Sequence, residues 1–316
     1  MKTILKMTAA ALVVLTAAPV IADDYPSKTI EVITHAGAGG GTDVTTRMMM
    51  LRGRRVLGQD MVVVNKRGGA GVVAMNYFQS NIDNDHLLMT FTSGHAIQMA
   101  AGKTGLKLED MRPIARGTDD PQIFMTRCDS AYNSPEKLLE AMKGTAVKFG
   151  TANLGDIDQI STYVFAKEGG LIQPNIVPFS GGGEVATQLV AGSVDVGVLN
   201  LAEAASQIDA GDICPQIILS ENPMSTIPNA KTSHALGVPV SFSTIRGFVA
   251  PATISDEQAA ILEEKLLKAM RHSAYQAFLN SVGLDASSVV GADAWGKQMS
   301  DMVKAMGPAL EELGMK

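Results

Sequence analysis

Residues 29–43 read Thr29-Ile30-Glu31-Val32-Ile33-Thr34-His35-Ala36-Gly37-Ala38-Gly39-Gly40-Gly41-Thr42-Asp43, and this stretch decides the fold. The β-branched residues at its start predict a strand over Thr29–Thr34. The glycines that follow form a loop almost without side chains, and a helix from about Asp43 to Leu57 comes next. A strand, a glycine loop and a helix in this order are typical of an α/β fold.

The same alternation continues after this stretch. We predict strands over Met61–Asn65 and Leu87–Thr92. Between them lie a second glycine turn, Gly68-Gly69-Ala70-Gly71, and a helix that runs through Gln79. Such a βαβαβ run predicts a parallel sheet with helices on both faces.

A second α/β set follows between residues 122 and 219. Its predicted strands are Gln122–Arg127, Lys148–Gly150, Ile176–Phe179, Val194–Leu199 and Ile213–Leu219. Its predicted helices are Ser134–Lys143, Ile157–Lys167, Gly183–Ala191 and Ala202–Ala210. Ser134 followed by Pro135 is a typical helix start.

The chain ends with a strand, Thr244–Ala250, and a helical tail over Ser255–Val282 and Asp293–Leu313. The tail must pack on something, and we expect it on the first α/β set. Lobe one is then discontinuous, residues 23–122 plus 244–316, and residues 123–243 are inserted as lobe two. The predicted fold class is α/β with two lobes and a ligand cleft between them, because open α/β sheets bind ligands beyond the carboxyl ends of their strands.

Residues 1–22 have the pattern of a secretory signal peptide. Lys2 and Lys6 give a positive start, Met7–Ala18 is an uncharged apolar run, and Val20-Ile21-Ala22 suits a signal peptidase. The alternative is a membrane anchor, but a bilayer span needs about 20 residues and this run is shorter. We predict export to the periplasm with cleavage after Ala22.

The charge of the chain restricts its partners. Removing Lys2 and Lys6 leaves 24 of the 26 basic residues against 32 acidic ones, so the net charge moves from −6 to −8. Such a chain should avoid nucleic acid and anionic membranes. Any bound anion must therefore be held by local dipoles and donors against the field of the whole chain.

Cys128 and Cys214 are the two cysteines of the chain. An oxidising compartment permits a disulfide between them, and both lie near strand edges of the predicted lobe two. We expect this disulfide, and two buried free thiols are the alternative.

Two glycine loops indicate where an anion would bind. Gly39-Gly40-Gly41-Thr42-Asp43 opens a helix in lobe one, and Ser180-Gly181-Gly182-Gly183 does so in lobe two. Bare backbone N–H groups at a helix N-terminus form an anion site without any basic residue. Two such loops in opposed lobes would grip one carboxylate from both sides. The alternative is that each loop merely connects a strand to a helix.

Other residues lie beside these loops. Ser93-Gly94 ends a predicted strand of lobe one and is either a ligand contact or a plain turn. His35 stands beside the first loop and is either a ligand contact or part of the cleft wall, and we favour the wall.

The motifs of common enzymes and metal sites are missing. Thr42 stands where a dinucleotide fingerprint needs its last glycine, and no Lys-Ser or Lys-Thr follows the glycines as a Walker motif requires. No Gly precedes Ser93 as a nucleophile elbow requires. The histidines and cysteines show none of the usual metal-ligand spacings. We therefore predict no cofactor, no metal and no enzymatic activity.

The ordered set of motifs resembles one known family over the mature chain. The segments that carry the resemblance are Tyr25-Pro26-Ser27-Lys28, Gly39-Gly40-Gly41-Thr42-Asp43, Asn65–Gly71, Val177–Gly183, Leu189–Val196 and Arg246–Pro251. They are similar to segments of the tripartite tricarboxylate transporter receptors, also called the Bug family.

The resemblance implies a type II periplasmic-binding fold and a monomeric receptor for small carboxylates. It also implies a transporter partner made of two membrane subunits. In that family a carboxylate is held by backbone groups and ordered water at the two glycine loops. By position this implicates Gly40, Gly41, Thr42, Asp43, Gly181, Gly182, Gly183 and Asn200. We expect Asp195 to brace a turn and not to contact the ligand.

This chain departs from the family pattern at the start of one lobe-two helix. Asp156 and Gln159 occupy places where the family often has Ser and His. An acid facing a dicarboxylate would repel it, which favours a ligand with one carboxylate and a polar or cationic distal end. The alternative, that Asp156 merely caps the helix, is favoured by the preference of Asp for that position.

Three hypotheses of function follow from the sequence. The first is a transport receptor that captures a small carboxylate and delivers it to a membrane transporter. The second uses the same fold to present the ligand to a signalling partner. The third, a secreted enzyme, lacks the nucleophile, metal and cofactor motifs that it needs.

Overall fold

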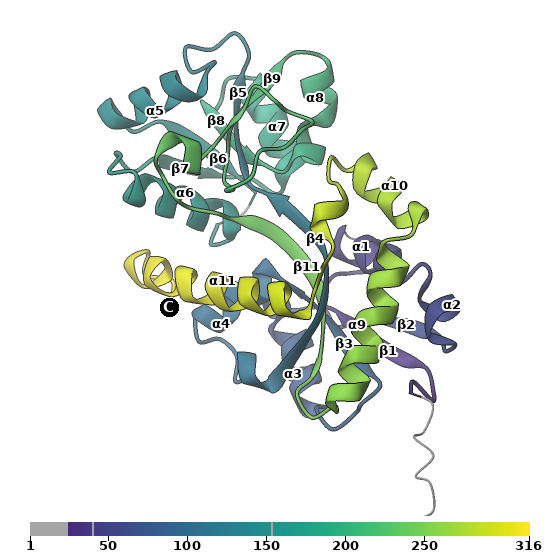
Figure 1. Ribbon diagram of the computed structural model, residues 1–316. Coiled ribbons are helices and arrows are strands. Elements are labelled where there is room, and N and C mark those ends of the chain that lie inside the picture. Colours follow the sequence, from purple (N-terminus) through teal and green to yellow (C-terminus); the bar gives the residue numbers. More distant parts are fainter. Residues whose placement is uncertain (1–24, 40, 153) are drawn as a thin grey trace, which may run out of the picture.

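The computed structural model describes residues 25–39, 41–152 and 154–316 and confirms the predicted α/β class. The chain forms two six-stranded sheets, one in each of two lobes that lie end to end, and helices flank both sheets (Figure 1). We call the part with the N-terminal sheet lobe one and the part with the other sheet lobe two. The predicted signal peptide lies outside the described residues.

The sheet of lobe one has the order β12-β4-β11-β3-β1-β2. In that order the strands are Val290–Gly291, Met111–Pro121, Ser243–Pro251, Leu87–Thr92, Ile30–Thr34 and Met61–Asn65. β1, β2 and β3 are parallel, whereas β11 is antiparallel to both β3 and β4.

The sheet of lobe two has the order β10-β9-β5-β8-β6-β7. In that order the strands are Lys231–Thr232, Ile213–Ile218, Ile123–Arg127, Val196–Leu199, Lys148–Thr151 and Asn175–Pro178. β5 is antiparallel to β8 and β9, and β6 is parallel to β7 and β8.

The three strands of the predicted βαβαβ run, β1, β2 and β3, are parallel as predicted, and the sheet of lobe one as a whole is mixed. β11 enters this sheet from the side of lobe two, so it must run against β3 and β4. β4 was not predicted as a strand. Its sequence includes Arg112, Pro113 and Gly117, which break the alternation of a half-buried strand.

β4 and β11 form the connection between the lobes (Figure 1). Their antiparallel register extends from Ser243 opposite Pro121 to Pro251 opposite Met111, with two irregularities. β4 leads directly to β5 of lobe two, and β11 brings the chain back to lobe one. The two crossings therefore lie next to each other as a pair of antiparallel strands.

The helices fill the connections between strands. The α-helices are α1 (Gly41–Met49), α2 (Gly53–Leu57), α3 (Val72–Ser80), α4 (Ser93–Ala100), α5 (Pro135–Gly144), α6 (Ile157–Glu168), α7 (Gly182–Val190), α8 (Ala205–Asp209), α9 (Asp256–Met270), α10 (Ser273–Ser281) and α11 (Ala292–Glu312). The 3₁₀ turns are η1 (Gly69–Gly71), η2 (Leu108–Asp110), η3 (Leu201–Ala204), η4 (His234–Leu236) and η5 (Ala286–Ser288).

Two predicted helices are each divided in the structure. The helix expected from Asp43 to Leu57 becomes α1 and α2, separated by a turn in which Gly53 N–H donates to the Met50 carbonyl over 2.7 Å. The helix expected over Ser255–Val282 becomes α9 and α10. His272 starts α10, because its Nδ1 accepts from the backbone N–H of Ala274 over 3.2 Å.

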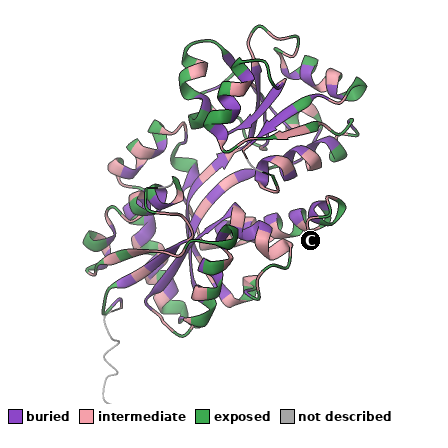
Figure 2. Ribbon diagram, turned by 180° about the vertical axis from the view of Figure 1, so that it is seen from behind, coloured by how far each residue is buried: buried purple, intermediate pink, exposed green. Residues whose placement is uncertain are grey.

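The core follows the strands of both sheets (Figure 2). All six residues of β3 are buried, as expected for a central strand covered on both faces. The tail helix α11 closes one face of lobe one with Trp295, which is fully buried and donates from Nε1 to the Phe248 carbonyl over 3.1 Å. Within the described residues, no helix combines the length and the apolar character needed to cross a membrane.

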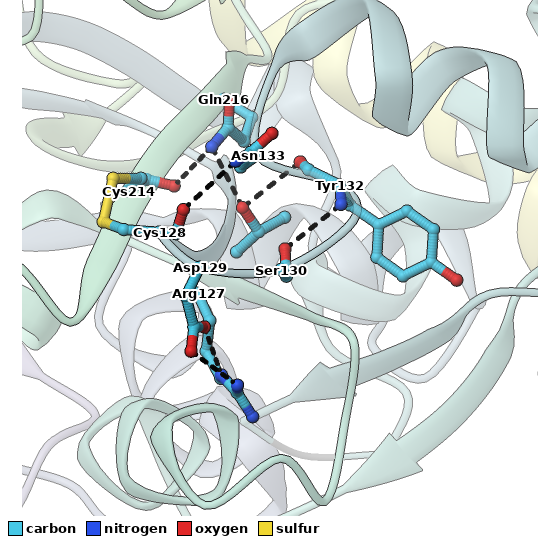
Figure 3. Close-up of a disulfide and its surroundings, with 9 residues drawn as sticks. Arg127, Cys128, Asp129, Ser130, Tyr132, Asn133, Cys214 and Gln216 are labelled. Atoms are coloured by element: carbon cyan, nitrogen blue, oxygen red, sulfur yellow. Dashed lines mark hydrogen bonds and ion pairs between the residues drawn. A yellow bond between two sulfur atoms is a disulfide. The ribbon is translucent and has the colours of Figure 1, made fainter.

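Cys128 and Cys214 are bonded to each other in lobe two (Figure 3). Cys128 follows β5 and Cys214 lies in β9, the neighbouring strand. Gln216 crosses between the same strands, since its Nε2 donates to Thr126 Oγ1 over 2.9 Å. The disulfide therefore links two strands that also pair through their backbones.

Replacing both cysteines by serine should lower the free energy of unfolding by about 2–5 kcal/mol. The disulfide joins residues that are 86 positions apart, and without it the unfolded chain gains conformational freedom. Urea unfolding of the variant and of the oxidised and reduced wild type measures this. Equal midpoints for the oxidised and reduced wild type would contradict it.

Candidate functional site

The first glycine loop is held by its own aspartate. Gly39 has a φ of +80°, which suits glycine, and its N–H donates to Asp43 Oδ2 over 2.9 Å. Asp43 also accepts from Arg47 Nε over 3.0 Å and from Asn65 Nδ2 over 2.8 Å. These bonds, that to Arg47 above all, lower the pKa of Asp43 to about 2. The side chain of Asp43 is only 2% exposed and braces the loop. Gly40 lies outside the described residues.

Gly41 and Thr42 present the start of α1 to the outside of the loop. Gly41 is exposed and Thr42 is half-buried. The first N–H groups of a helix have no partner within the helix, so this end can receive an anion. Thr42 Oγ1 accepts from Arg246 Nε over 3.3 Å, which links the loop to the start of β11.

Ser93 and Gly94 form the first turn of α4, so they begin a helix and are not a plain turn. Behind them His95 is fully buried, and its Nδ1 accepts from the Thr92 N–H over 3.2 Å. The rings of His35 and His95 meet edge to face, with centroids 4.7 Å apart. Burial lowers the pKa of both histidines, that of His95 strongly. The pair is a neutral wall behind the glycine loop.

Gly71 fits closely against this wall. Its φ is +104°, and a Cβ there would lie 2.6 Å from His95 Cδ2. Glycine is therefore needed in the second glycine turn of lobe one, because the backbone of Gly71 packs directly against the imidazole of His95.

The glycine turn of lobe two is covered by an acid of the chain itself. A Cβ at Gly182 would lie 2.2 Å from Glu203 Cδ, so the carboxylate of Glu203 rests against the start of α7. Glu203 Oε2 also accepts from the Asn200 N–H over 2.9 Å. Ser180 N–H donates to Glu184 Oε2 over 2.9 Å. The positive end of α7 thus already faces the carboxylates of Glu203 and Glu184, whereas the acid in the first turn of α1, Asp43, is paired with Arg47.

Asp156 caps α6, as the second of the two sequence interpretations proposed. Its Oδ1 accepts from Asp158 N–H over 3.0 Å, and Gln159 Oε1 accepts from Gly155 N–H over 2.8 Å. Asp158 is buried, and burial followed by the charge of Asp156 raises its pKa well above the usual range.

Asn200 joins lobe two to the connecting strands. Its Nδ2 donates to the carbonyls of Asp120 over 2.9 Å and Pro121 over 3.0 Å, and its Oδ1 accepts from Thr244 Oγ1 over 3.2 Å. These three bonds hold the amide in place between β4 and β11.

Sequence reasoning missed three charged residues that the fold brings together at this junction, namely Asp120, Glu203 and Arg246. Asp120 is only 8% exposed, and within the described residues its Oδ1 has no hydrogen-bond partner. Burial raises the pKa of Asp120 to about 8, against the opposing charge of Arg246. Burial also raises the pKa of Glu203, although its side chain keeps contact with solvent.

Arg246 lies at the carboxyl end of β3, opposite Thr92. The residues on either side of Arg246 in the sequence are those of an ordinary buried strand, and the one signal of a site was a basic residue inside that strand. In the described part of the chain no carboxylate oxygen comes within 4.0 Å of its guanidinium, and its one hydrogen bond is that to Thr42. We call Thr42, Asp120, Asn200, Glu203 and Arg246 the junction cluster.

A cavity of about 370 Å³ lies on the other face of β4. It is lined by Arg116 and Asp119, which form an ion pair at 2.5 Å. Asp119 and Asp120 alternate along the strand, so Asp119 points away from the junction cluster. Among the described residues no group of His, Cys, Asp and Glu is arranged to hold a metal ion.

Comparison with known proteins gives one consistent result. Residues 45–315 match the family described as the tripartite tricarboxylate transporter family receptor. Protein BugT of Bordetella pertussis is 28% identical over 231 residues, which cover 71% of this chain and 70% of that protein.

Solved structures share the fold. A TctC solute-binding protein from Polaromonas, without ligand, has a TM-score of 0.83 at 24% identity, covering 91% of this chain and 99% of that one. MatC from Rhodopseudomonas palustris with bound malate has a TM-score of 0.68 at 19% identity, covering 90% and 100%. The two-lobed fold inferred from the sequence is therefore confirmed.

The raised pKa of Asp120 predicts how stability depends on pH. The native state keeps a proton up to about pH 8 that the unfolded chain releases near 3.8. The native state thus binds more protons in this window, so the free energy of unfolding falls as pH rises. One such group contributes a slope of at most about 1.4 kcal/mol per pH unit.

Asp120→Asn should flatten this slope between pH 5 and pH 7.5 in urea unfolding experiments. Asp209→Asn, at an exposed position at the end of α8, is the control and should leave the slope unchanged. The same slope in Asp120→Asn as in the wild type would show that Asp120 is ionised throughout the window.

Proposed function

We propose a function from one premise: the chain belongs to the tripartite tricarboxylate transporter receptor family. This confirms the resemblance stated from the sequence. The family is one of non-enzymatic solute-binding receptors, so the hypothesis of a secreted enzyme is rejected. The proposal beyond this premise concerns what the receptor binds and how.

The receptor captures a small organic carboxylate in the periplasm and delivers it to a membrane transporter of two subunits. The observation that carries the proposal is the contact of the start of α1 with Arg246 at the junction, where Glu203 of lobe two also acts on Arg246. Thr42 contacts Arg246, and Arg246 lies within electrostatic reach of Asp120 and Glu203. Gly182 of α7 touches Glu203. The malate bound by MatC supports a carboxylate as the ligand.

Binding proceeds on one lobe first and is completed by closure of the other. The start of α1 supplies partial positive charge and, at Gly41 and Thr42, N–H groups that have no partner within the helix. Asp43 holds that loop in shape. β4 and β11 are the two strands about which the lobes rotate, which is hinge closure of the kind known for two-lobed binding proteins.

A thermal-shift screen of the purified mature protein against mono-, di- and tricarboxylates tests this function. A ligand that binds only the native state raises the unfolding midpoint by mass action. We expect a concentration-dependent rise with at least one small carboxylate. The absence of any rise, with protein that native mass spectrometry shows to be ligand-free, would refute a carboxylate receptor.

Gly41→Val should reduce the affinity for that carboxylate about 10- to 100-fold, because a side chain there covers the first N–H groups of α1. In the described part of the chain no atom lies within 4 Å of a Cβ at Gly41, so the variant should fold normally. Gly144→Val, at the exposed end of α5, is the matched control. Gly182→Val is unsuitable, since it would displace Glu203. Unchanged affinity in folded Gly41→Val would remove this loop from the site.

A further inference from the structure

Among the described residues, Arg246 forms no ion pair within 4.0 Å. It occupies a half-buried position at the end of the lobe-one sheet, and its only hydrogen bond among the described residues runs from Nε to Thr42 Oγ1. A guanidinium presents a fork of N–H donors that matches a carboxylate in a bidentate manner and stays charged in proteins. Taking such a group out of water without a partner is unfavourable. The two η nitrogens therefore offer a binding place for a ligand carboxylate.

Asp120 is the complementary group. It stands opposite Thr244, whereas Arg246 stands opposite Thr118, so the two charged residues occupy diagonal positions on the same face of the β4–β11 pair. Diagonal positions of this kind lie about 7–8 Å apart. The two side chains do not form an ion pair with each other within 4.0 Å in the described residues. Positions at this spacing are suited to contact two adjacent ligand groups of opposite charge.

Among the described residues, the groups that act electrostatically on Asp120 besides Arg246 are the acids Glu203 and Asp119. Glu203 acts electrostatically on both Asp120 and Arg246, and Asp156 acts on Glu203. A second carboxylate on the ligand would have to lie among these acids, which is unfavourable. An ammonium group would instead find the unpartnered, nine-tenths buried oxygen of Asp120.

We infer that the ligand is a small zwitterion of the amino-acid type, whose carboxylate pairs with Arg246 and whose ammonium group donates to Asp120. The inference rests on the proposed function and narrows it, because it adds a required ammonium group. It also assigns ligand contacts to two residues that lie outside the glycine loops.

The alternative is that a protonated Asp120 donates a hydrogen bond to the second carboxylate of a dicarboxylate. The two cases differ in whether ligand binding releases or takes up a proton. An ammonium group favours the ionised form of Asp120 and releases a proton on binding near pH 7, since the pKa of this carboxyl is about 8 in the empty protein. A second carboxylate favours the protonated form and takes a proton up.

The experiment compares ligand pairs that differ only in the ammonium group: L-alanine and propionate, L-leucine and 4-methylpentanoate, L-aspartate and succinate. Titration calorimetry in two buffers with different ionisation enthalpies gives the affinity and the proton balance together. We expect at least one amino acid to bind about 10- to 100-fold more tightly than its partner acid, which is the effect of one charge-assisted hydrogen bond. We also expect proton release.

Variants of Arg246 and Asp120 test which residue causes the difference in affinity between an amino acid and its partner acid. Arg246→Met should weaken both members of the pair, whereas Asp120→Asn should remove the difference between them and abolish the proton release. Arg55→Met and Asp209→Asn, both at exposed positions, are matched controls and should change neither quantity.

Tighter binding of the acid that lacks the ammonium group, or proton uptake, would overturn the inference and leave the carboxylate receptor intact. Binding of neither class, with carboxylates silent in the thermal-shift screen as well, would overturn the proposed function together with the inference. The ratio of the two affinities in the wild type tests whether the ligand needs an ammonium group, even where a variant does not fold.

Discussion

The pairing of β4 with β11 is the constraint on which the rest of the structure depends. These two strands belong to the lobe-one sheet, and they also carry the chain into and out of lobe two. Their register places Asp120 and Arg246 on one face at the end of the sheet and sends Asp119 to the other face. Asn200 is then bonded to both strands from lobe two. The positions of two charged side chains, and of the amide that joins them to lobe two, thus follow from one antiparallel ladder.

The electrostatics of the junction contrast with those of the loops around it. Asp43, Asp156 and Glu184 are each paired with backbone N–H groups of their own loops and so stabilise the turns. Asp120 and Arg246 are not satisfied in this way. Buried polar groups without partners are rare in folded proteins, and they concentrate where a ligand completes the set. The start of α7 holds the carboxylate of Glu203, whereas the carboxylate in the first turn of α1 is paired with Arg47, so the start of α1 is the helix end that we expect to receive an anion.

Much of the architecture could be predicted from sequence because local pattern and global fold agree. The strand at residues 30–34, the glycine loop behind it and the helix caps at Ser134 and Ser255 all follow from local rules. β4 could not be found, because its polar and proline residues are accommodated only by pairing with a strand more than a hundred residues later. The same long-range pairing makes the sheet of lobe one mixed, although its first three strands are parallel as predicted.

The candidate site was predicted in part, for a related reason. Glycine loops and helix starts are continuous in sequence, so Gly41, Thr42 and the cap at Asp156 could be identified there. Asp120, Glu203 and Arg246 read as ordinary charges along the chain, and only the fold brings them to one place. Among the described residues, Asp120 Oδ1 has no hydrogen-bond partner and Arg246 no carboxylate within 4.0 Å, and a sequence does not display such a feature.

The central claim is that the two lobes close on a ligand at this junction about the β4–β11 pair. Small-angle X-ray scattering of the ligand-free protein, and of the protein saturated with the carboxylate that raises its unfolding midpoint, tests it most directly. The account predicts a smaller radius of gyration for the saturated protein, with the molecular mass of a monomer in both states. An unchanged radius of gyration at saturating ligand would contradict closure and would place the binding site on one lobe alone.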